Sequence, residues 1–272
     1  MTKRQPIHRI ADALDRFAPP PTATPDPAGV LAFVWTGDGL APIDAFNPLP
    51  IAQLSGIEAQ RDAVFENSRR LAAGHAAHDV LLWGARGSGK SALVKSCIGA
   101  LQAEGAAIRL IEISPDHMAD LSRLFAIVAR WQQAAVIFID DLAFDRQDHP
   151  VRLLRSVLEG GANARPARAR IYVTSNRRHI VARDMPGEAL AVNLRDAAED
   201  SLALADRFGL SLGFHACDQN GYLTMISGYA KAYGFGFDSA DALTWAAQRG
   251  ARSGRMAWHY TIECLGRLGR SA

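Results

Sequence analysis

The residues with the clearest chemical meaning form one short run that could bind phosphate. Positions 84–91 read Gly-Ala-Arg-Gly-Ser-Gly-Lys-Ser and follow the apolar run Val-Leu-Leu-Trp at 80–83. The three glycines tolerate backbone angles that other residues avoid, so the N–H groups of the loop can wrap an anion. Lys90 offers a charge to the β- and γ-phosphates of a nucleotide, and Ser91 offers a hydroxyl to Mg²⁺. Residues 91–98 then have a helical pattern, and a helix N-terminus also favours negative charge.

A strand before this run and a helix after it are the context that a P-loop requires. The alternative is a glycine-rich turn that binds nothing. We predict that the phosphates of ATP contact the loop and the first residues of the helix. The predicted contacts are Gly84, Ala85, Arg86, Gly87, Ser88, Gly89, Lys90, Ser91 and Ala92.

Two acidic residues end a second apolar run. Positions 136–139 read Val-Ile-Phe-Ile, and Asp140 and Asp141 follow. An apolar strand that ends in aspartate is the Walker B pattern, in which the carboxylate helps to hold Mg²⁺. We expect Asp140, together with Ser91, to hold the metal, and Asp141 to orient or activate the attacking water. The alternative for both acids is a turn or a helix cap.

Asn176 ends a third apolar run, Ile-Tyr-Val-Thr-Ser at 171–175. A strand adjacent to the P-loop strand would point Asn176 at the γ-phosphate, where its amide could position water. The alternative is an asparagine that forms a turn, a common role for this residue.

Alternating strand and helix patterns surround these positions. Strands are expected at 31–35, 80–83, 108–113, 135–140, 171–175 and 210–214. Helices are expected at 57–71, at 91–98, at 151–158, and from a cap at Ser114 to Trp131. This alternation predicts an α/β fold with a mostly parallel, doubly wound sheet. From about residue 218 only helical patterns remain, at 221–233, 239–249 and 255–268.

Three parts are therefore predicted. Residues 1–30 hold a helix of unknown docking partner, with its apolar face at Ile7, Ile10, Leu14 and Phe17, and a proline-rich linker. Residues 31–217 form an α/β nucleotide-binding domain, and residues 218–272 form a small helical lid.

Composition limits the possible partners and setting. Hydrophobic residues make up 49% and charged residues 21% of the 272 positions, and the formal net charge of +2 gives no general signature of polyanion binding. No apolar run approaches the ~20 residues needed to span a bilayer. The three cysteines are widely spaced and give no disulfide or metal pattern, which favours a reducing cytoplasm. No apolar stretch follows the N-terminus, so a secretory signal is not expected.

Arginines bracket the run at 171–175, and they are Arg165, Arg168, Arg170, Arg177, Arg178 and Arg183. Arg165 and Arg168 lie in a proline-containing loop, where they could meet a polyanion or an acidic partner. The alternative is a solvated loop. Aromatic residues are not interleaved here, so a stacking surface for single-stranded nucleic acid is not indicated.

In their order along the chain, these motifs resemble those of an AAA+ ATPase. The series is the P-loop, the Walker B strand, Thr-Ser-Asn at 174–176, Asp-Arg-Phe-Gly at 206–209, and the helical lid. In detail the chain resembles an uncharacterised bacterial family of AAA+ ATP-binding proteins. That resemblance runs from about residue 31 to the C-terminus and also rests on the segments 54–58, 158–161, 206–214 and 252–255.

The resemblance implies roles for individual residues of the site. Asn176 matches the sensor-1 position. Arg255 best matches the sensor-2 arginine of the lid, and Arg252 is the other candidate. Gly56 and Ile57 match the segment that packs against adenine.

The resemblance also makes Arg207 a candidate arginine finger, which in this superfamily reaches the ATP of a neighbouring subunit and so implies self-association. An arginine supplied in this way stabilises charge on the γ-phosphoryl oxygens and raises rates by roughly 10³–10⁵ in P-loop enzymes. The alternative is a surface ion pair with Asp206 or another nearby acid.

The expected function is ATP hydrolysis at subunit interfaces, with Mg²⁺, to remodel or load an unknown protein client. Many AAA+ motors end Walker B in Asp-Glu, whereas this chain has Asp-Asp. The shorter Asp141 leaves open slow or partner-dependent hydrolysis, and hence a nucleotide-gated switch that binds ATP with little turnover. A monomeric P-loop kinase of small molecules is disfavoured by Arg207 and by the helical C-terminus.

Overall fold

A single sheet of seven strands organises the described part of the chain. The computed structural model describes residues 26–143, 149–160, 165–176 and 205–271. The strand order is β2-β1-β4-β5-β6-β3-β7. The strands are β1 (Ala32–Trp35), β2 (Leu40–Pro42), β3 (Val80–Gly84), β4 (Ile108–Ile113), β5 (Ala134–Ile139), β6 (Ala169–Ser175) and β7 (Leu210–Phe214). The predicted helix at 7–17 lies outside the described residues.

The mostly parallel sheet predicted from the sequence is confirmed. Every pair of neighbouring strands is parallel except β1 and β2, which run antiparallel. The three-residue β2 was not predicted, because so short a segment has no alternation to detect.

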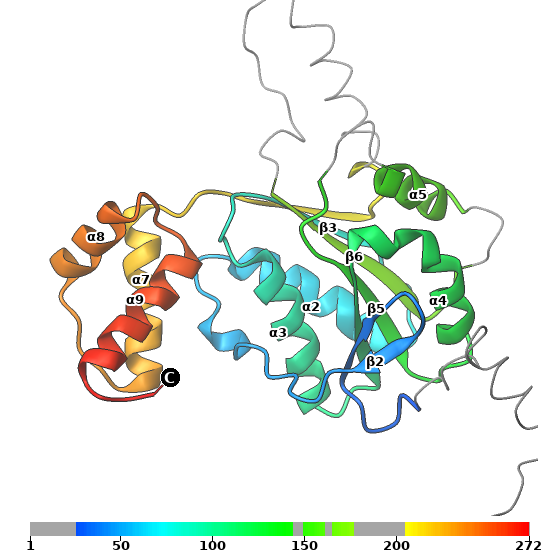
Figure 1. The fold of residues 1–272 in the computed structure, drawn as a ribbon, viewed down its shortest axis with the longest axis horizontal. Helices are drawn as coiled ribbons and strands as arrows, with labels where there is room; N and C mark the ends of the chain where they lie inside the picture. The colour runs from blue at the N-terminus through cyan, green and yellow to red at the C-terminus, as the bar shows by residue number, and fades with distance from the viewer. Residues whose placement is uncertain (1–25, 144–148, 161–164, 177–204, 272) are drawn as a thin grey trace, which may run out of the picture.

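Helices cover both faces of the sheet (Figure 1). The helices α2 (Glu58–Ala72) and α3 (Lys90–Ala103) share one apolar core with one face, and α4 (Leu121–Val128) and α5 (His149–Leu158) share a second core with the other face. The fully buried β5 contributes alternate side chains to the two cores, with Ile137 and Ile139 on one side and Val136 and Phe138 on the other. This explains why its sequence is a continuous apolar run.

The helix predicted from Ser114 to Trp131 differs in its detail. The Ser114 hydroxyl accepts from Asp116 N at 3.4 Å, as expected for a cap. A 3₁₀ helix, η2 (Pro115–Asp120), comes first, and α4 ends at Val128 rather than at Trp131. Trp131 lies beyond the end of the helix, and its ring packs against Phe33, with ring centroids 5.4 Å apart.

The C-terminal helices lie beside the sheet and have a core of their own (Figure 1). They are α7 (Gln219–Tyr233), α8 (Ser239–Gln248) and α9 (Gly254–Arg267). Each begins where a side-chain oxygen accepts from a backbone N–H three residues on, at Asp218, Asp238 and Ser253. Among the described residues, none of the helices combines the length and apolar character needed to cross a membrane.

Strand direction decides where the polar motifs meet. The P-loop follows β3, Asp140 follows β5, and Asn176 follows β6. Because these strands are parallel neighbours, with β6 paired to both β3 and β5, their carboxyl ends lie at one edge of the sheet. This edge is where ligands bind in open α/β sheets.

Candidate functional site

The P-loop leaves the sheet through a position that only glycine can occupy. Gly84 has φ of 126°, and a Cβ atom built on it would lie 2.1 Å from the carbonyl oxygen of Phe214 on β7. Ala85 N donates to that same oxygen at 2.8 Å. Gly89 has φ of 91° and caps α3, so the chain passes directly from the loop into the helix. The loop is therefore fixed between β7 and α3.

Lys90 is drawn into the curve of this loop and is only 5% exposed. Its Nζ atom donates to the carbonyl oxygens of Gly84 at 3.1 Å and Ala85 at 2.8 Å, and to Oδ1 of Asn176 at 2.9 Å. Burial lowers the pKa of Lys90, while the charges of Asp141 and Asp140 oppose that shift. These are the donors and charges that a phosphate group would engage.

Asp140 lies next to two hydroxyl groups. Its Oδ1 atom accepts from Ser91 Oγ at 2.6 Å and from Thr174 Oγ1 at 2.5 Å. Carboxylate and hydroxyl oxygens are ligands that suit Mg²⁺, which usually takes one or two protein oxygens and completes its shell with phosphate and water. The donor set of Ser91 and Asp140 therefore fits Mg²⁺. Within the described residues, histidine, cysteine and acidic side chains form no group of three or more that could hold a metal ion.

Asp141 is turned toward the end of β6. Among the described residues it alone combines a side chain with a positive φ, of 55°. Aspartate is one of the residues that tolerate this region. Its backbone N–H donates to Thr174 Oγ1 at 2.8 Å, and its Oδ1 accepts from Nδ2 of Asn176. Asp141 and Asn176, both predicted for the site, are thus in direct contact.

Sequence reasoning missed the role of Thr174, which joins the two acids. Its hydroxyl donates to Asp140 and accepts from the Asp141 N–H, and the residue is 1% exposed. A signal was present, because Thr174 lies two positions before Asn176 and side chains two apart point to the same face of a strand.

A pocket of about 420 Å³ adjoins these groups, a volume within the range of small-molecule sites. Its polar half contains all the predicted residues from Arg86 to Ala92, with Asp140, Asp141 and Asn176. The remaining wall is mainly apolar, and its lining includes Leu49, Leu54, Ile57, Met225, Tyr229 and Trp258.

Three of the predicted nucleotide contacts lie outside this lining. Gly84 and Ala85 instead turn their carbonyl oxygens to Lys90. Gly56 has φ of 79°, and its N–H donates to Glu58 Oε1 at 2.8 Å, so it shapes the turn before α2. Its neighbour Ile57 does line the pocket.

Helix α9 begins against the P-loop. A Cβ atom on Gly87 would lie 3.0 Å from Ser253 Oγ and 3.7 Å from Arg255 Cβ. Of the two candidates for the lid arginine, Arg255 lines the pocket and Arg252 does not. The apolar contributions of Met225, Tyr229 and Trp258 were also missed, because only the folded chain brings these helices to the P-loop.

Arg207 lies at the opposite edge of the sheet from the P-loop of its own chain. It precedes β7, whose first residue Leu210 pairs with Val80, whereas the last, Phe214, pairs with Gly84 at the P-loop edge. Its guanidinium forms an ion pair with Glu159, just after α5. The structure therefore contains an ion pair of Arg207 with a nearby acid. This was the alternative to the role of Arg207 as an arginine finger.

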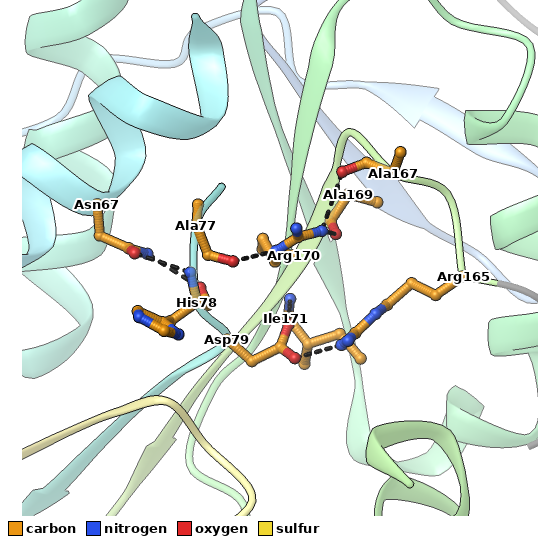
Figure 2. Close-up of polar contacts among 9 residues, drawn as sticks. All are labelled: Asn67, Ala77, His78, Asp79, Arg165, Ala167, Ala169, Arg170 and Ile171. Atoms are coloured by element: carbon orange, nitrogen blue, oxygen red, sulfur yellow. Dashed lines mark hydrogen bonds and ion pairs between the residues drawn. The ribbon is translucent and has the colours of Figure 1, made fainter. Parts of the chain in front are cut away.

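The arginines just before β6 and at its start contact their own chain, as Figure 2 shows for Arg165 and Arg170. Arg165 forms an ion pair with Asp79, which is 7% exposed and also accepts from Ile171 N at 2.8 Å. Arg170 Nε donates to the Ala77 carbonyl at 2.6 Å. Arg168 donates to the Ala72 carbonyl at 3.2 Å. These contacts, which fix the approach to β3, favour a structural role. Arg177, Arg178 and Arg183 lie outside the described residues.

Comparison with known proteins gives a family and a fold. A family model described as "Protein of unknown function (DUF815)" matches residues 28–268. No curated protein matches the sequence. Similar solved structures include a RuvB variant from Thermotoga maritima, with a TM-score of 0.52 and 19% identity over 83% of this chain and 68% of that one. The Orc1 protein from Aeropyrum pernix in complex with DNA gives a TM-score of 0.52 and 15% identity over 84% and 67%.

These two proteins are AAA+ ATPases, so the fold predicted from the motifs is confirmed: an α/β sheet of AAA+ type with a C-terminal helical region. At such low identity the likeness shows the fold alone. The chain spans about two thirds of the length of these structures.

Proposed function

The chain belongs to the family described as "Protein of unknown function (DUF815)", and we propose that it binds ATP with Mg²⁺ and hydrolyses it where two copies of the chain meet. Its AAA+ fold implies nucleotide binding. One observation carries the proposal. Lys90, the adjacent Asp140 and Asp141, and Asn176 come from three separate segments and converge on a single hydrogen-bonded network at the edge of the pocket.

The polar half of the pocket would hold the triphosphate. The loop amides and Lys90 would bind its oxygens, and Lys90 would exchange the carbonyls of Gly84 and Ala85 for phosphate. Ser91 and Asp140 would hold Mg²⁺, which would neutralise the negative charge that develops on the phosphates. The apolar wall would receive the base, between Ile57 of the α/β part and the side chains of α7 and α9.

Asp141 and Asn176 would handle the attacking water. Asp141 is an exposed carboxylate beside Lys90 and can accept a proton from water. Asn176 contacts both Lys90 and Asp141, so its amide can orient a water between the γ-phosphate and the carboxylate. General bases of this kind typically contribute 10²–10⁴-fold, roughly, to a rate.

Arg207 is proposed to act on the ATP of a neighbouring copy. It lies at the amino end of β7, whereas the P-loop lies at the carboxyl end of β3, so its own site is out of reach. An interface between the Arg207 edge of one copy and the P-loop edge of another would bring Arg207 to the γ-phosphate of the second copy's ATP.

A nucleotide-gated switch is the second candidate, and the geometry of Asp141 favours it. This carboxylate accepts from Asn176 and its backbone is held by Thr174. If ATP leaves that contact intact, water is not activated and the bound nucleotide acts only as a signal.

We propose a protein client rather than a nucleic acid. Arg165, Arg168 and Arg170 donate to Asp79 or to carbonyl oxygens of their own chain, which leaves them poorly placed to bind a phosphate backbone. The complex of Orc1 with DNA is a property of that protein.

The test is steady-state ATP hydrolysis per protomer over a wide range of protein concentration. A specific rate that rises with concentration and yields ADP and phosphate supports shared sites. ATP binding by calorimetry with a rate near zero at every concentration supports the switch. A protein that binds no ATP contradicts both proposals.

A further inference from the structure

The ion pair between Arg207 and Glu159 joins two segments at the sheet edge opposite the P-loop. The two side chains are 31% and 48% exposed, so the pair lies at the surface. Exposed pairs of this kind are weak, because water screens both charges. A group with more negative charge could therefore take the guanidinium from the carboxylate.

The backbone that carries Arg207 is held firmly in place. Phe208 is 4% exposed within the core. A Cβ atom on Gly209 would lie 2.1 Å from Nδ1 of His78, so this position fits against the chain before β3. Leu210 N donates to the Asp79 carbonyl at 3.2 Å. The direction of the guanidinium thus depends on its own rotamer and on the groups that contact it, Glu159 among them.

Asp79, whose carbonyl accepts from Leu210 N, is itself held in place by contacts with β6 and with the residues before it. Its carboxylate pairs with Arg165 and accepts from the Ile171 N–H (Figure 2). The segment before β7 is therefore attached to the starts of both β3 and β6. Because the backbone is held at these points, we expect Arg207 to change its contacts by rotation of its side chain and not by movement of the loop.

Glu159 lies where a carboxylate needs a cation nearby. It follows Leu158, the last residue of α5, and its N–H still donates to the Arg155 carbonyl at 3.0 Å. The C-terminal end of a helix is its negative end, so an acid there is unfavourable unless a positive charge compensates it. Arg155 lies in the last turn of α5, and the guanidinium of Arg207 adds a positive charge that pairs with Glu159 directly.

We propose that Glu159 is a positioning residue that holds Arg207 in the separate subunit and releases it to the γ-phosphate of a neighbour's ATP. On assembly, Arg207 then exchanges the Glu159 carboxylate for a triphosphate. Glu159 competes with the neighbouring nucleotide and so sets the protein concentration at which shared sites form. This inference rests on the proposed action of Arg207 between subunits.

The test compares ATP hydrolysis by the full-length protein, by Glu159→Gln and by Arg207→Ala as protein concentration is varied. Glu159→Gln keeps the shape of the side chain and removes its charge. We expect its half-maximal concentration to fall about two- to fivefold, as an exposed pair implies, with a saturating rate close to that of the wild type. The shift should shrink at high salt, where the original pair is already screened.

Glu66→Gln is the matched control, since it removes an exposed carboxylate that pairs with Arg69 and Arg70 on α2. It should leave the concentration profile unchanged. Light scattering with a non-hydrolysable ATP analogue gives a readout independent of turnover, and Glu159→Gln should assemble at lower concentration there too.

Two results would overturn the inference while leaving the proposed function intact. Both require that Arg207→Ala abolishes the concentration-dependent rate. In the first, Glu159→Gln has the wild-type profile in both assays. In the second, Glu159→Gln loses the saturating rate as Arg207→Ala does. Glu159 would then hold Arg207 in the position in which it acts on the neighbouring ATP, and would not hold it back. If Arg207→Ala itself behaves as wild type, the shared site and this inference fail together.

Discussion

The Nζ atom of Lys90 lies 2.9 Å from Oδ1 of Asn176, so the P-loop and the end of β6 are joined directly. The same asparagine donates to Asp141. A lysine that binds phosphate and a carboxylate that can activate water are thereby linked through one amide. If a γ-phosphate binds Lys90 and changes its contact with Asn176, the contact between Asn176 and Asp141 should change too.

Replacing Lys90 should remove tight ATP binding. Lys90→Ala loses the buried ammonium and its charge-assisted contacts, each typically worth about 1.5–3 kcal/mol, so we expect affinity to fall by at least tenfold, roughly, in titration calorimetry. Lys95→Ala is the control on the same helix, because its ammonium pairs with Glu112 away from the pocket. Equal affinity of Lys90→Ala and Lys95→Ala would remove Lys90 from the site.

Asp141→Asn should separate binding from turnover. The amide keeps the size of the side chain but cannot take a proton, so hydrolysis should fall about 10²–10⁴-fold. ATP affinity should change little, because Lys90 and the loop amides remain. The checks are phosphate release and calorimetry on the same sample. An undiminished rate would show that another group activates water.

Thr174→Val tests the hydroxyl that joins the two acids. It leaves the Asp141 N–H without its partner and removes one donor to Asp140. We expect a loss of about 1–3 kcal/mol in unfolding free energy and a lower rate of hydrolysis. Thr224→Val is the control, since that hydroxyl donates to the Asn220 carbonyl within the exposed part of α7. Equal rates for the two variants would leave Thr174 with no role in positioning the acids.

The two lid arginines should differ. Arg255 lines the pocket beside Gly87, whereas Arg252 lies outside the lining. Arg255→Ala should weaken ATP binding about tenfold, as expected for one charge-assisted hydrogen bond, while Arg252→Ala should retain wild-type affinity. The reverse order in calorimetry would mean that the lid moves on binding so that Arg252 replaces Arg255.

Much of the fold and of the phosphate site follows from local patterns. The glycines, Lys90 and Ser91 lie within eight positions, and Asp140 and Asn176 each follow an apolar strand. Parallel pairing then brings these strand ends together without further information. For this reason the sequence alone was enough to predict which side chains form the polar edge of the pocket.

The remaining contacts depend on packing between distant segments. Trp258 and Met225 reach the pocket because α7 and α9 fold against the P-loop, and no spacing in the sequence encodes that approach. Arg207 forms an ion pair with Glu159, which lies 48 positions away in the sequence. The short β2 and the 3₁₀ turn before α4 were missed because tertiary packing, rather than periodicity, determines them.

The most direct test of shared sites is a mixing experiment with two inactive variants. Lys90→Ala cannot hold ATP but keeps Arg207, whereas Arg207→Ala holds ATP but lacks the guanidinium. Each alone should hydrolyse ATP far more slowly than the wild type. When they are mixed, an intact Arg207 can reach ATP held by the other variant, so we predict that hydrolysis reappears. Two variants that assemble together, as light scattering would detect, yet stay inactive would contradict catalysis between subunits.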